Sequence, residues 1–150
     1  MNKIYSSEEK RKILLNNYNN PDKQIEFEEL KKISTNQKIP FLTVRSLDDG
    51  CGDTLHLLLV KEKNCLKKCF FSGYQSCLIT VASANIILSC LEKKNSRLAK
   101  EILDNCQKMI KKEDYDLGEC SNFQIFSDID KFPHRIECIK LVIRGINNLL

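Results

Sequence analysis

The stretch FLTVRSLDDGCGD, residues 41–53, joins an alternating run of apolar and β-branched residues to a segment rich in aspartate and glycine. Alternation with a period of two predicts a half-buried strand over residues 41–47. Gly50 and Gly52 supply the backbone freedom that a tight turn requires. We therefore expect a strand that runs directly into a compact loop carrying Cys51 and Asp53.

The pattern on both sides of this stretch predicts an α+β fold with a three-stranded antiparallel sheet and about four to five helices. Two more strands are expected at 54–63 and 65–72, with Asn64 as the turn between them. Apolar residues spaced three and four apart predict helices, the first capped by Ser6 and the third by Ser96. The helices are expected at about 7–20, 77–91, 96–112 and 133–149.

Two segments lack sustained periodicity. Residues 22–40 are polar and mixed, and we interpret them as a linker or flap with a short helical turn at 26–33. Residues 113–130 are expected to form a loop with short turns. Because the 150 residues contain 42% apolar side chains and no internal repeat, we expect one domain over 1–150.

Composition excludes several classes of protein. The longest uncharged apolar stretch, 76–91, is shorter than the roughly 20 residues that a membrane span needs. The first ten residues already include acidic side chains and do not resemble a secretory signal. We therefore expect a cytoplasmic protein whose eight cysteines are reduced thiols. The net charge of +4 is scattered among acidic residues, which argues against nucleic-acid binding.

Three cysteines occupy positions where sulfur chemistry is plausible. Cys51 and Asp53 flank Gly52, so a thiolate and a carboxylate could point at one place, although a glycine-rich turn with an Asx cap explains the same residues. Cys77 is expected at a helix start, where free amide hydrogens stabilise a thiolate. Cys138 follows the helix start at 132–133, so the same argument applies more weakly. Each of the two could instead be a small buried hydrophobe.

The two histidines and the other cysteines are weaker candidates. His134 precedes Cys138 by four residues and could be a ligand or a tuning base, or simply a solvent-facing residue. His56 is interpreted as structural, because no nucleophile spacing surrounds it. Cys120 stays undecided. Packing explains the remaining four cysteines best, namely Cys65, Cys69, Cys90 and Cys106.

Three separated motifs together resemble the NifU/IscU family of iron-sulfur assembly proteins. They are Cys51-Gly52-Asp53 after the first strand, Cys77 ahead of Ala82-Ser83-Ala84, and FPHRIEC at 132–138. The Tyr18 and Asn20-Pro21 pattern is similar to the family's entry helix. Within the family the chain resembles SufU, because 113–130 looks like an insert that IscU proteins lack and because Glu137 stands where IscU has a histidine.

The resemblance implies a zinc site made by Cys51, Asp53, Cys77 and Cys138. Three thiolates and one carboxylate form a closed tetrahedral set for Zn²⁺. It further implies that Cys51 accepts persulfide sulfur from a PLP-dependent, SufS-like cysteine desulfurase and passes it toward iron-sulfur acceptor proteins. If the protein is an enzyme, it is then a zinc-dependent sulfurtransferase.

Three further residues would act beside this site, and two features depart from the family pattern. Arg135 would orient the site or steer the partner, with His134 and Glu137 as possible auxiliary residues. Ser76 replaces the glycine usual before the second cysteine, and Glu137 reverses the charge common before the last one. We expect Glu137 to make the site less attractive to anionic sulfur species.

Two other functions stay open on the sequence. The same thiolates could carry a transient [2Fe-2S] cluster, in which case the protein is a noncatalytic scaffold that assembles the cluster and hands it on. Alternatively, the metal could be a structural zinc ion in a module that binds another protein.

Overall fold

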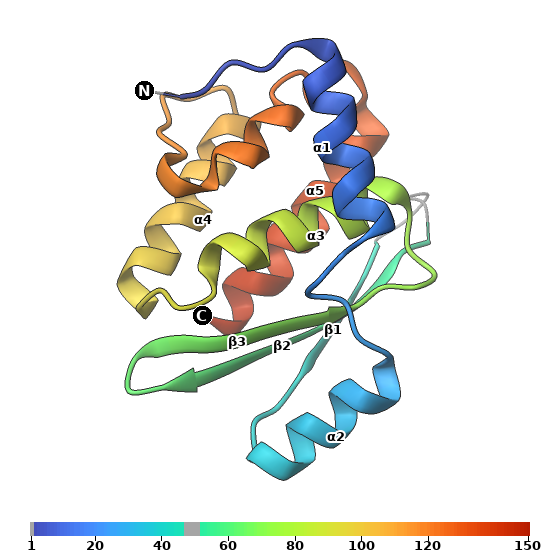
Figure 1. The fold of residues 1–150 in the computed structure, drawn as a ribbon, viewed down its shortest axis with the longest axis vertical. Coiled ribbons are helices and arrows are strands. Elements are labelled where there is room, and N and C mark those ends of the chain that lie inside the picture. Colours follow the sequence, from blue (N-terminus) through green and yellow to red (C-terminus); the bar gives the residue numbers. More distant parts are fainter. Residues whose placement is uncertain (1, 47–51) are drawn as a thin grey trace.

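The computed structural model describes residues 2–46 and 52–150, which form a three-stranded sheet with helices on both faces (Figure 1). This confirms the predicted α+β architecture. The elements are α1 (Ser7–Asn19), α2 (Phe27–Gln37), β1 (Leu42–Arg45), β2 (Thr54–Glu62), β3 (Cys65–Ser72), α3 (Leu78–Leu91), α4 (Ser96–Ile110), the 3-10 helices η1 (Gly118–Phe126) and η2 (Ile129–Lys131), and α5 (Pro133–Leu149).

The sheet has the order β1-β2-β3, and both pairings are antiparallel. Leu57 pairs with Leu42 on one side and with Phe71 on the other. The β2–β3 turn places both Lys63 and Asn64 at positive φ, 52° and 67°. Two consecutive residues of this kind match the right-handed twist of the flanking strands, and the turn lies where Asn64 predicts it.

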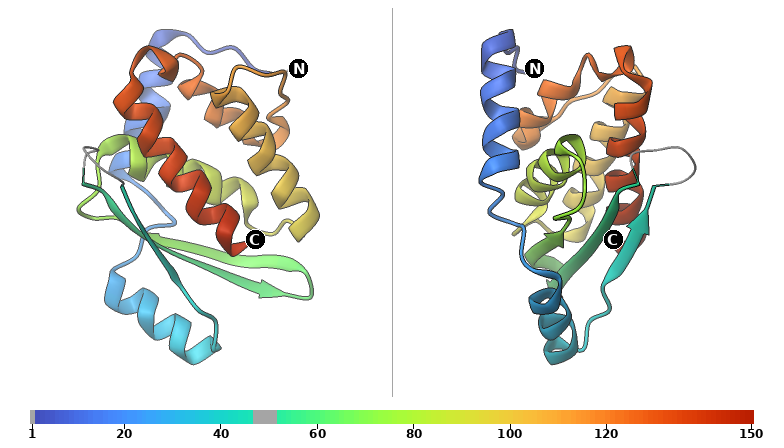
Figure 2. Two further views of the ribbon diagram at one scale, coloured as in Figure 1. Left: turned by 180° about the vertical axis from the view of Figure 1, so that it is seen from behind. Right: turned by 90° about the vertical axis from the view of Figure 1, so that its right-hand side faces the viewer.

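Each face of the sheet packs against different helices. Leu55, Leu57 and Phe71 are fully buried in the main core, where α3 contacts β3 and α5 contacts β1 and β2. Leu58, on the opposite face, is buried in a smaller cluster with Leu30 of α2. Figure 2 shows α2 apart from the larger helical layer. The larger layer therefore holds most of the buried apolar surface.

The interpretation of residues 22–40 as a linker or flap is wrong, because α2 occupies most of this segment. Its apolar residues are few, yet Leu30 is fully buried and Phe27 stacks on His56 at a ring distance of 3.7 Å. Just before the helix, Lys23 and Ile25 make backbone hydrogen bonds with Phe71 of β3. The segment thus protects the free edge of the sheet.

The central helix α3 is buried around almost its whole circumference. Its polar residues are therefore hydrogen-bonded, as burial requires. Ser83 donates to the carbonyl oxygen of Ile79 at 2.7 Å, and Asn85 donates to Asn17 of α1 at 2.8 Å. The Asn85 contact joins α3 to α1.

The helix starts follow their capping residues. Ser6 caps α1 as predicted, and the structure adds that Glu9 completes a reciprocal capping box. For α4 the predicted cap is one residue off: the Asn95 side chain accepts from the backbone of Leu98 at 2.8 Å, and Ser96 is the first helical residue. Asparagine is at least as good a cap as serine, so the shift costs nothing.

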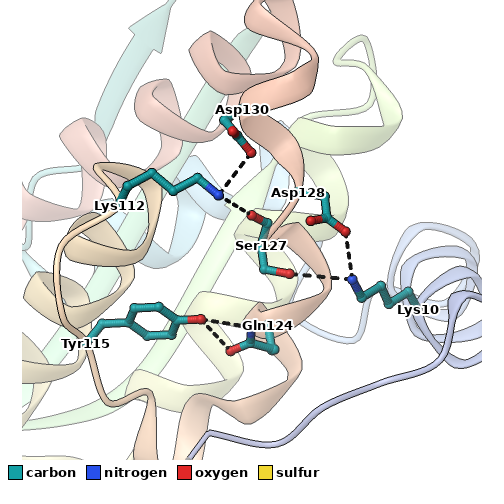
Figure 3. A network of polar contacts seen from close by, with 7 residues as sticks. All are labelled: Lys10, Lys112, Tyr115, Gln124, Ser127, Asp128 and Asp130. Atoms are coloured by element: carbon teal, nitrogen blue, oxygen red, sulfur yellow. Dashed lines mark hydrogen bonds and ion pairs between the residues drawn. The ribbon is translucent and has the colours of Figure 1, made fainter.

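Residues 113–130 form short 3-10 turns that polar contacts hold in place, in agreement with a loop of short turns (Figure 3). Lys112 donates to the Ser127 carbonyl oxygen at 3.0 Å and pairs with Asp130 at 3.1 Å. Lys10 of α1 pairs with Asp128 at 3.1 Å. In residues 2–46 and 52–150, no helix is long and apolar enough to cross a membrane.

Candidate metal centre

Two thiols and one carboxylate from distant parts of the chain meet at the edge of the main core. Asp53 lies directly before β2, Cys77 is the N-cap of α3, and Cys138 lies in the second turn of α5. Their candidate ligand atoms all lie within 4.8 Å of one another. The two sulfur atoms are 3.4 Å apart. Three of the four residues that the resemblance implies are thus brought together.

Asp53 is almost completely buried, at 1% exposure, and its carboxylate is turned toward α3. One oxygen accepts from the backbone N–H of Cys77 at 2.9 Å, and the other accepts from the Thr80 hydroxyl. Both donors belong to the first turn of α3, where unpaired amide hydrogens favour a negative charge. Asp53 therefore caps a helix far along the chain, in contrast to an Asx cap of its own turn.

Cys77 has the properties of a reactive thiol. A hydrogen bond with Cys138 and further ones from the backbone and hydroxyl of Thr80 lower the pKa of Cys77 to about 6, against the opposing effects of burial and of the Asp53 charge. Its sulfur lies 3.6 Å from the Thr80 hydroxyl. Since thiolates are the nucleophiles and the metal ligands, Cys77 is available for either role at neutral pH.

Cys138 is the more buried of the two cysteines, at 6% exposure. Its sulfur lies 3.6 Å from the carbonyl oxygen of His134, one helical turn earlier. Pro133 opens the helix and sets its direction, so that Cys138 faces α3. The start of α5 therefore delivers one thiol to the site.

Cys51 lies outside the described residues, so its proposed role is not tested here. The chain resumes at Gly52, whose φ of 69° is in the left-handed region that favours glycine. Asp53 follows, with its carbonyl oxygen accepting from the Ser46 backbone at 2.9 Å. Ser46 and Asp53, two described residues on either side of Cys51 in the sequence, are thus hydrogen-bonded to each other.

The three auxiliary candidates lie outside the group. His134 is exposed, and its ring does not join the three ligand residues. Glu137 is exposed and pairs with Lys140 at 3.6 Å. Arg135 lies over the Phe132 ring at 4.8 Å and lines a small apolar hollow together with Lys10 and Arg11 of α1. Glu137 also lines a hollow, which α5 shares with Gln107 and Ile110 of α4.

The residues interpreted as structural have packing contacts. His56 Nδ1 lies 2.7 Å from the Thr43 hydroxyl, and burial lowers the pKa of His56, with smaller contributions from Arg45 and Lys31. Cys69 and Cys106 are buried in the main core. Burial raises the pKa of Cys69 to about 12, which makes it inert.

Two residues beside the site have contacts that the sequence analysis did not predict. Thr80 hydrogen-bonds with Asp53 and with the sulfur of Cys77. Its signal is a polar side chain three residues after a helix N-cap in an otherwise apolar segment. Ser76 donates to the Thr54 carbonyl oxygen at 2.8 Å and ties the Cys77 turn to β2. The serine that departs from the family pattern therefore has a positioning role.

The donor set suits thiophilic metals. Zn²⁺ binds cysteine sulfur and carboxylate oxygen in tetrahedral sites, and iron-sulfur clusters are held mainly by cysteine thiolates. Two thiols and a carboxylate leave one position of a tetrahedral site for a further ligand. Fold and site together define a small α+β protein that gathers thiols and a carboxylate at one end of a buried helix.

Comparison with known proteins points to the same class. No protein family model matches the chain. The iron-sulfur cluster assembly scaffold protein IscU of Thermotoga maritima is 29% identical over 101 residues, which make up 67% of this chain and 70% of that protein.

Two solved structures share the fold. A putative iron-sulfur cluster assembly scaffold protein for the SUF system of Fervidobacterium islandicum aligns with a TM-score of 0.73 and 18% identity, over 97% of this chain and 95% of the other. The N-terminal part of a NifU-like protein of Brucella abortus aligns with a TM-score of 0.71 and 13% identity, over 92% and 89%. The resemblance to NifU/IscU-like proteins, with a SufU-like architecture, is confirmed.

Proposed function

We propose that this protein takes part in iron-sulfur cluster assembly in the cytoplasm, with Asp53, Cys77 and Cys138 as its metal-binding centre. The observation that carries the proposal is the convergence of these three side chains within 4.8 Å. Each comes from one of the three motifs that resemble the NifU/IscU family. The sequence relative from Thermotoga maritima is an iron-sulfur cluster assembly scaffold protein, which agrees with this role.

We further propose that Cys51 is the fourth ligand of a zinc ion and the acceptor of sulfur. In the sequence it lies between Ser46 and Asp53, and these two residues are joined by a backbone hydrogen bond of 2.9 Å. Zinc would hold the thiolates in their ionised form and protect them from oxidation. A ligand supplied by a partner could replace Cys51 on the metal and release its thiolate.

The transfer itself conserves electrons. The Cys51 thiolate attacks the terminal sulfur of a persulfide on a cysteine desulfurase. The sulfur-sulfur bond of the donor breaks, the donor cysteine leaves as a thiolate, and Cys51 carries the persulfide. Asp53, Cys77 and Cys138 would hold the metal while Cys51 reacts.

The test is a desulfurase assay with a cysteine substrate. We expect the protein to raise the rate of sulfide production in the presence of a reductant, and mass spectrometry to find one extra sulfur on Cys51. Cys51→Ala should lose both effects. Cys65→Ala is the matched control, because Cys65 lies on β3 outside the group and should leave both unchanged. An unchanged rate with no persulfide on Cys51 would reject sulfur acceptance.

Assembly of a [2Fe-2S] cluster on the same residues is the second candidate, favoured by the name of the relative and by the thiol-rich donor set. Anaerobic reconstitution with iron and sulfide distinguishes the two. A brown protein that transfers its cluster to an apo-ferredoxin supports the scaffold role. A colourless protein with one tightly held zinc ion supports sulfur transfer.

The desulfurase assay also distinguishes both candidates from a third function, that of a purely structural zinc module. That function predicts ordinary desulfurase kinetics together with unfolding when a chelator removes the metal. Zinc analysis of wild type and Cys138→Ala, purified without added metal, then reports directly on whether this centre holds the ion.

A further inference from the structure

Two groups of basic residues that are separate in the sequence lie together beside the β2–β3 turn. Residues 61–68 contain four lysines, and residues 93–100 contain three lysines and one arginine. The backbone of Leu66 accepts a hydrogen bond from Lys93 at 2.6 Å and donates one to Lys94 at 2.8 Å. Figure 1 shows the turn next to the connection between α3 and α4. The fold therefore joins the two groups into one basic region.

This basic region contains more positive than negative charge. Three of its cations have a carboxylate partner at 2.9 to 3.8 Å, in the pairs Lys67–Glu62, Lys94–Glu119 and Arg97–Glu101. The other five are exposed and form no ion pair within residues 2–46 and 52–150, namely Lys61, Lys63, Lys68, Lys93 and Lys100. We call these five residues the lysine surface. Like charges gathered in this way create a positive potential that attracts an anionic partner.

The lysine surface and the metal centre lie at opposite ends of α3. Cys77 caps the start of the helix, and Lys93 follows shortly after its end at Leu91. At about 1.5 Å of rise per residue, the helix separates the two ends by roughly 20 Å. A partner bound to the lysine surface would therefore leave the metal centre open to a second molecule.

The composition of the basic region favours carboxylates over phosphates as its ligands. Neither 61–68 nor 93–100 contains an aromatic residue on which a nucleic-acid base could stack. Guanidinium groups bind phosphate in a bidentate manner, but Arg97 already pairs with Glu101. The carboxylates that border the lysines would also repel a continuous chain of phosphates. Separate carboxylates on a protein can instead lie between these acidic residues.

We propose that the lysine surface is a docking site for an acidic segment of a partner protein. Aspartate and glutamate side chains of the partner would supply the counter-charges that the five lysines lack. Such complementarity speeds the encounter of two proteins and fixes their orientation. The inference uses no residue of the metal centre, so it does not depend on the proposed function.

The backbone of the lysine surface allows its charge to be removed without strain. Lys63 and Lys93 have φ values of 52° and 72°, in the left-handed region that favours glycine. Lys63→Gly and Lys93→Gly therefore remove two charges while the backbone keeps a favourable conformation. Lys38, the C-cap of α2, is also exposed and has a φ of 56°. Lys38→Gly is the matched control, because it makes the same change outside the lysine surface.

The test measures how a fluorescein-labelled decapeptide of aspartate and glutamate binds to the full chain, by fluorescence anisotropy. We expect saturable binding that weakens as the salt concentration rises from about 50 to about 200 mM, because salt screens exposed charges. The double variant Lys63→Gly/Lys93→Gly should bind at least about fivefold more weakly, and Lys38→Gly should stay within about twofold of wild type. Urea denaturation should show no loss of stability in the double variant, which excludes misfolding as the cause.

A nuclear magnetic resonance titration of the isotope-labelled wild type locates the bound peptide. We expect shifted amide signals in 61–68 and 93–100 and unchanged signals at Cys77 and Cys138. The proposal is overturned if no saturable binding occurs, if the shifts lie elsewhere, or if Lys38→Gly loses as much affinity as the double variant. It is also overturned if a DNA duplex or a phosphatidylserine vesicle binds the lysine surface more tightly than the peptide does.

Discussion

At the scale of single residues, the acidity of one thiol depends on a few precise contacts. Cys138 and Thr80 both interact with the sulfur of Cys77, and together they outweigh the burial that would keep this thiol protonated. Cys69, buried in the same core without such contacts, has a raised pKa. Burial by itself therefore does not decide whether a cysteine in this protein is reactive.

The first prediction concerns this thiol in metal-free protein. The rate at which iodoacetamide alkylates Cys77 should rise with pH, reach half its maximum near pH 6 and level off above that, because only the thiolate reacts. Peptide mapping at several pH values measures it. Thr80→Val should shift the midpoint upward, and Cys69 should remain unlabelled at neutral pH. A Cys77 midpoint at the ordinary thiol value would contradict the assignment.

The second prediction separates the two roles of Asp53. Asp53→Asn keeps an oxygen that can accept from the Cys77 backbone but removes the charge, so zinc affinity should fall at least about tenfold with little loss of stability. Asp53→Ala also removes the helix cap and should cost about 1–2 kcal/mol of unfolding free energy. Competition with a coloured zinc chelator and urea denaturation measure the two effects. Equal zinc affinity of wild type and Asp53→Asn would exclude Asp53 as a ligand.

At the scale of elements, α5 lies unusually close to the sheet. A Cβ atom on Gly145 would lie 2.6 Å from Leu57 and 3.1 Å from Val44, so glycine is required for the helix to pack on β1 and β2. Cys138 is on the same helix, two turns earlier. The close packing of α5 on the sheet therefore helps to fix the position of the Cys138 thiol.

The third prediction follows from that approach. Gly145→Ala should destabilise the protein by about 1–3 kcal/mol, because overpacking outweighs the roughly 1 kcal/mol that alanine contributes to a helix. Urea denaturation measures the change. Asn147→Ala, at an exposed position of the same helix, is the control and should stay within about 0.5 kcal/mol of wild type. A stabilised Gly145→Ala variant would contradict the close packing.

The fourth prediction concerns the contact between α2 and the sheet. Burial and nearby positive charge lower the pKa of His56, so the folded state disfavours its protonation. The contribution of neutral His56 to the free energy of unfolding should therefore be fully present above the pKa of histidine in the unfolded chain, about 6.5. It should decline as the pH falls below that value. His56→Phe retains a ring to stack on Phe27 and should lack this part of the decline. Thermal unfolding at several pH values compares the two; identical pH profiles would contradict it.

At the scale of the whole molecule, the candidate metal centre joins three parts of the fold. Asp53 belongs to the start of β2, Cys77 to that of α3 and Cys138 to that of α5. A cation held by all three would link the sheet to α3 and α5, which both pack on its main-core face. Metal binding and global stability should therefore be coupled.

The fifth prediction tests this coupling. Zinc at a free concentration 100-fold above its dissociation constant should raise the free energy of unfolding by about 2.7 kcal/mol, and a chelator should remove the gain. Cys138→Ala should unfold at the same midpoint with and without zinc. Calorimetry on wild type and variant provides the measurement. A zinc-independent midpoint in wild type would show that the folded state does not hold the ion.

Local signals in the sequence were sufficient for much of the fold. The Lys63–Asn64 turn, the Ser6 capping box and the Pro133 helix start all lie where the residues predict them. These features depend on the conformational preferences of a few adjacent residues. By contrast, only a short helical turn at 26–33 was predicted where α2 forms, because the full helix relies on Phe27 and Leu30 packing against the sheet and its own pattern is weak.

The sequence by itself determined which side chains are the candidate ligands, because the motifs around Asp53, Cys77 and Cys138 are recognisable in it. Only the tertiary structure decided that these three side chains meet and that Thr80 joins them. The reason is physical: local preferences act over a few residues, whereas contacts between distant segments depend on how buried helices pack against one another and against the sheet.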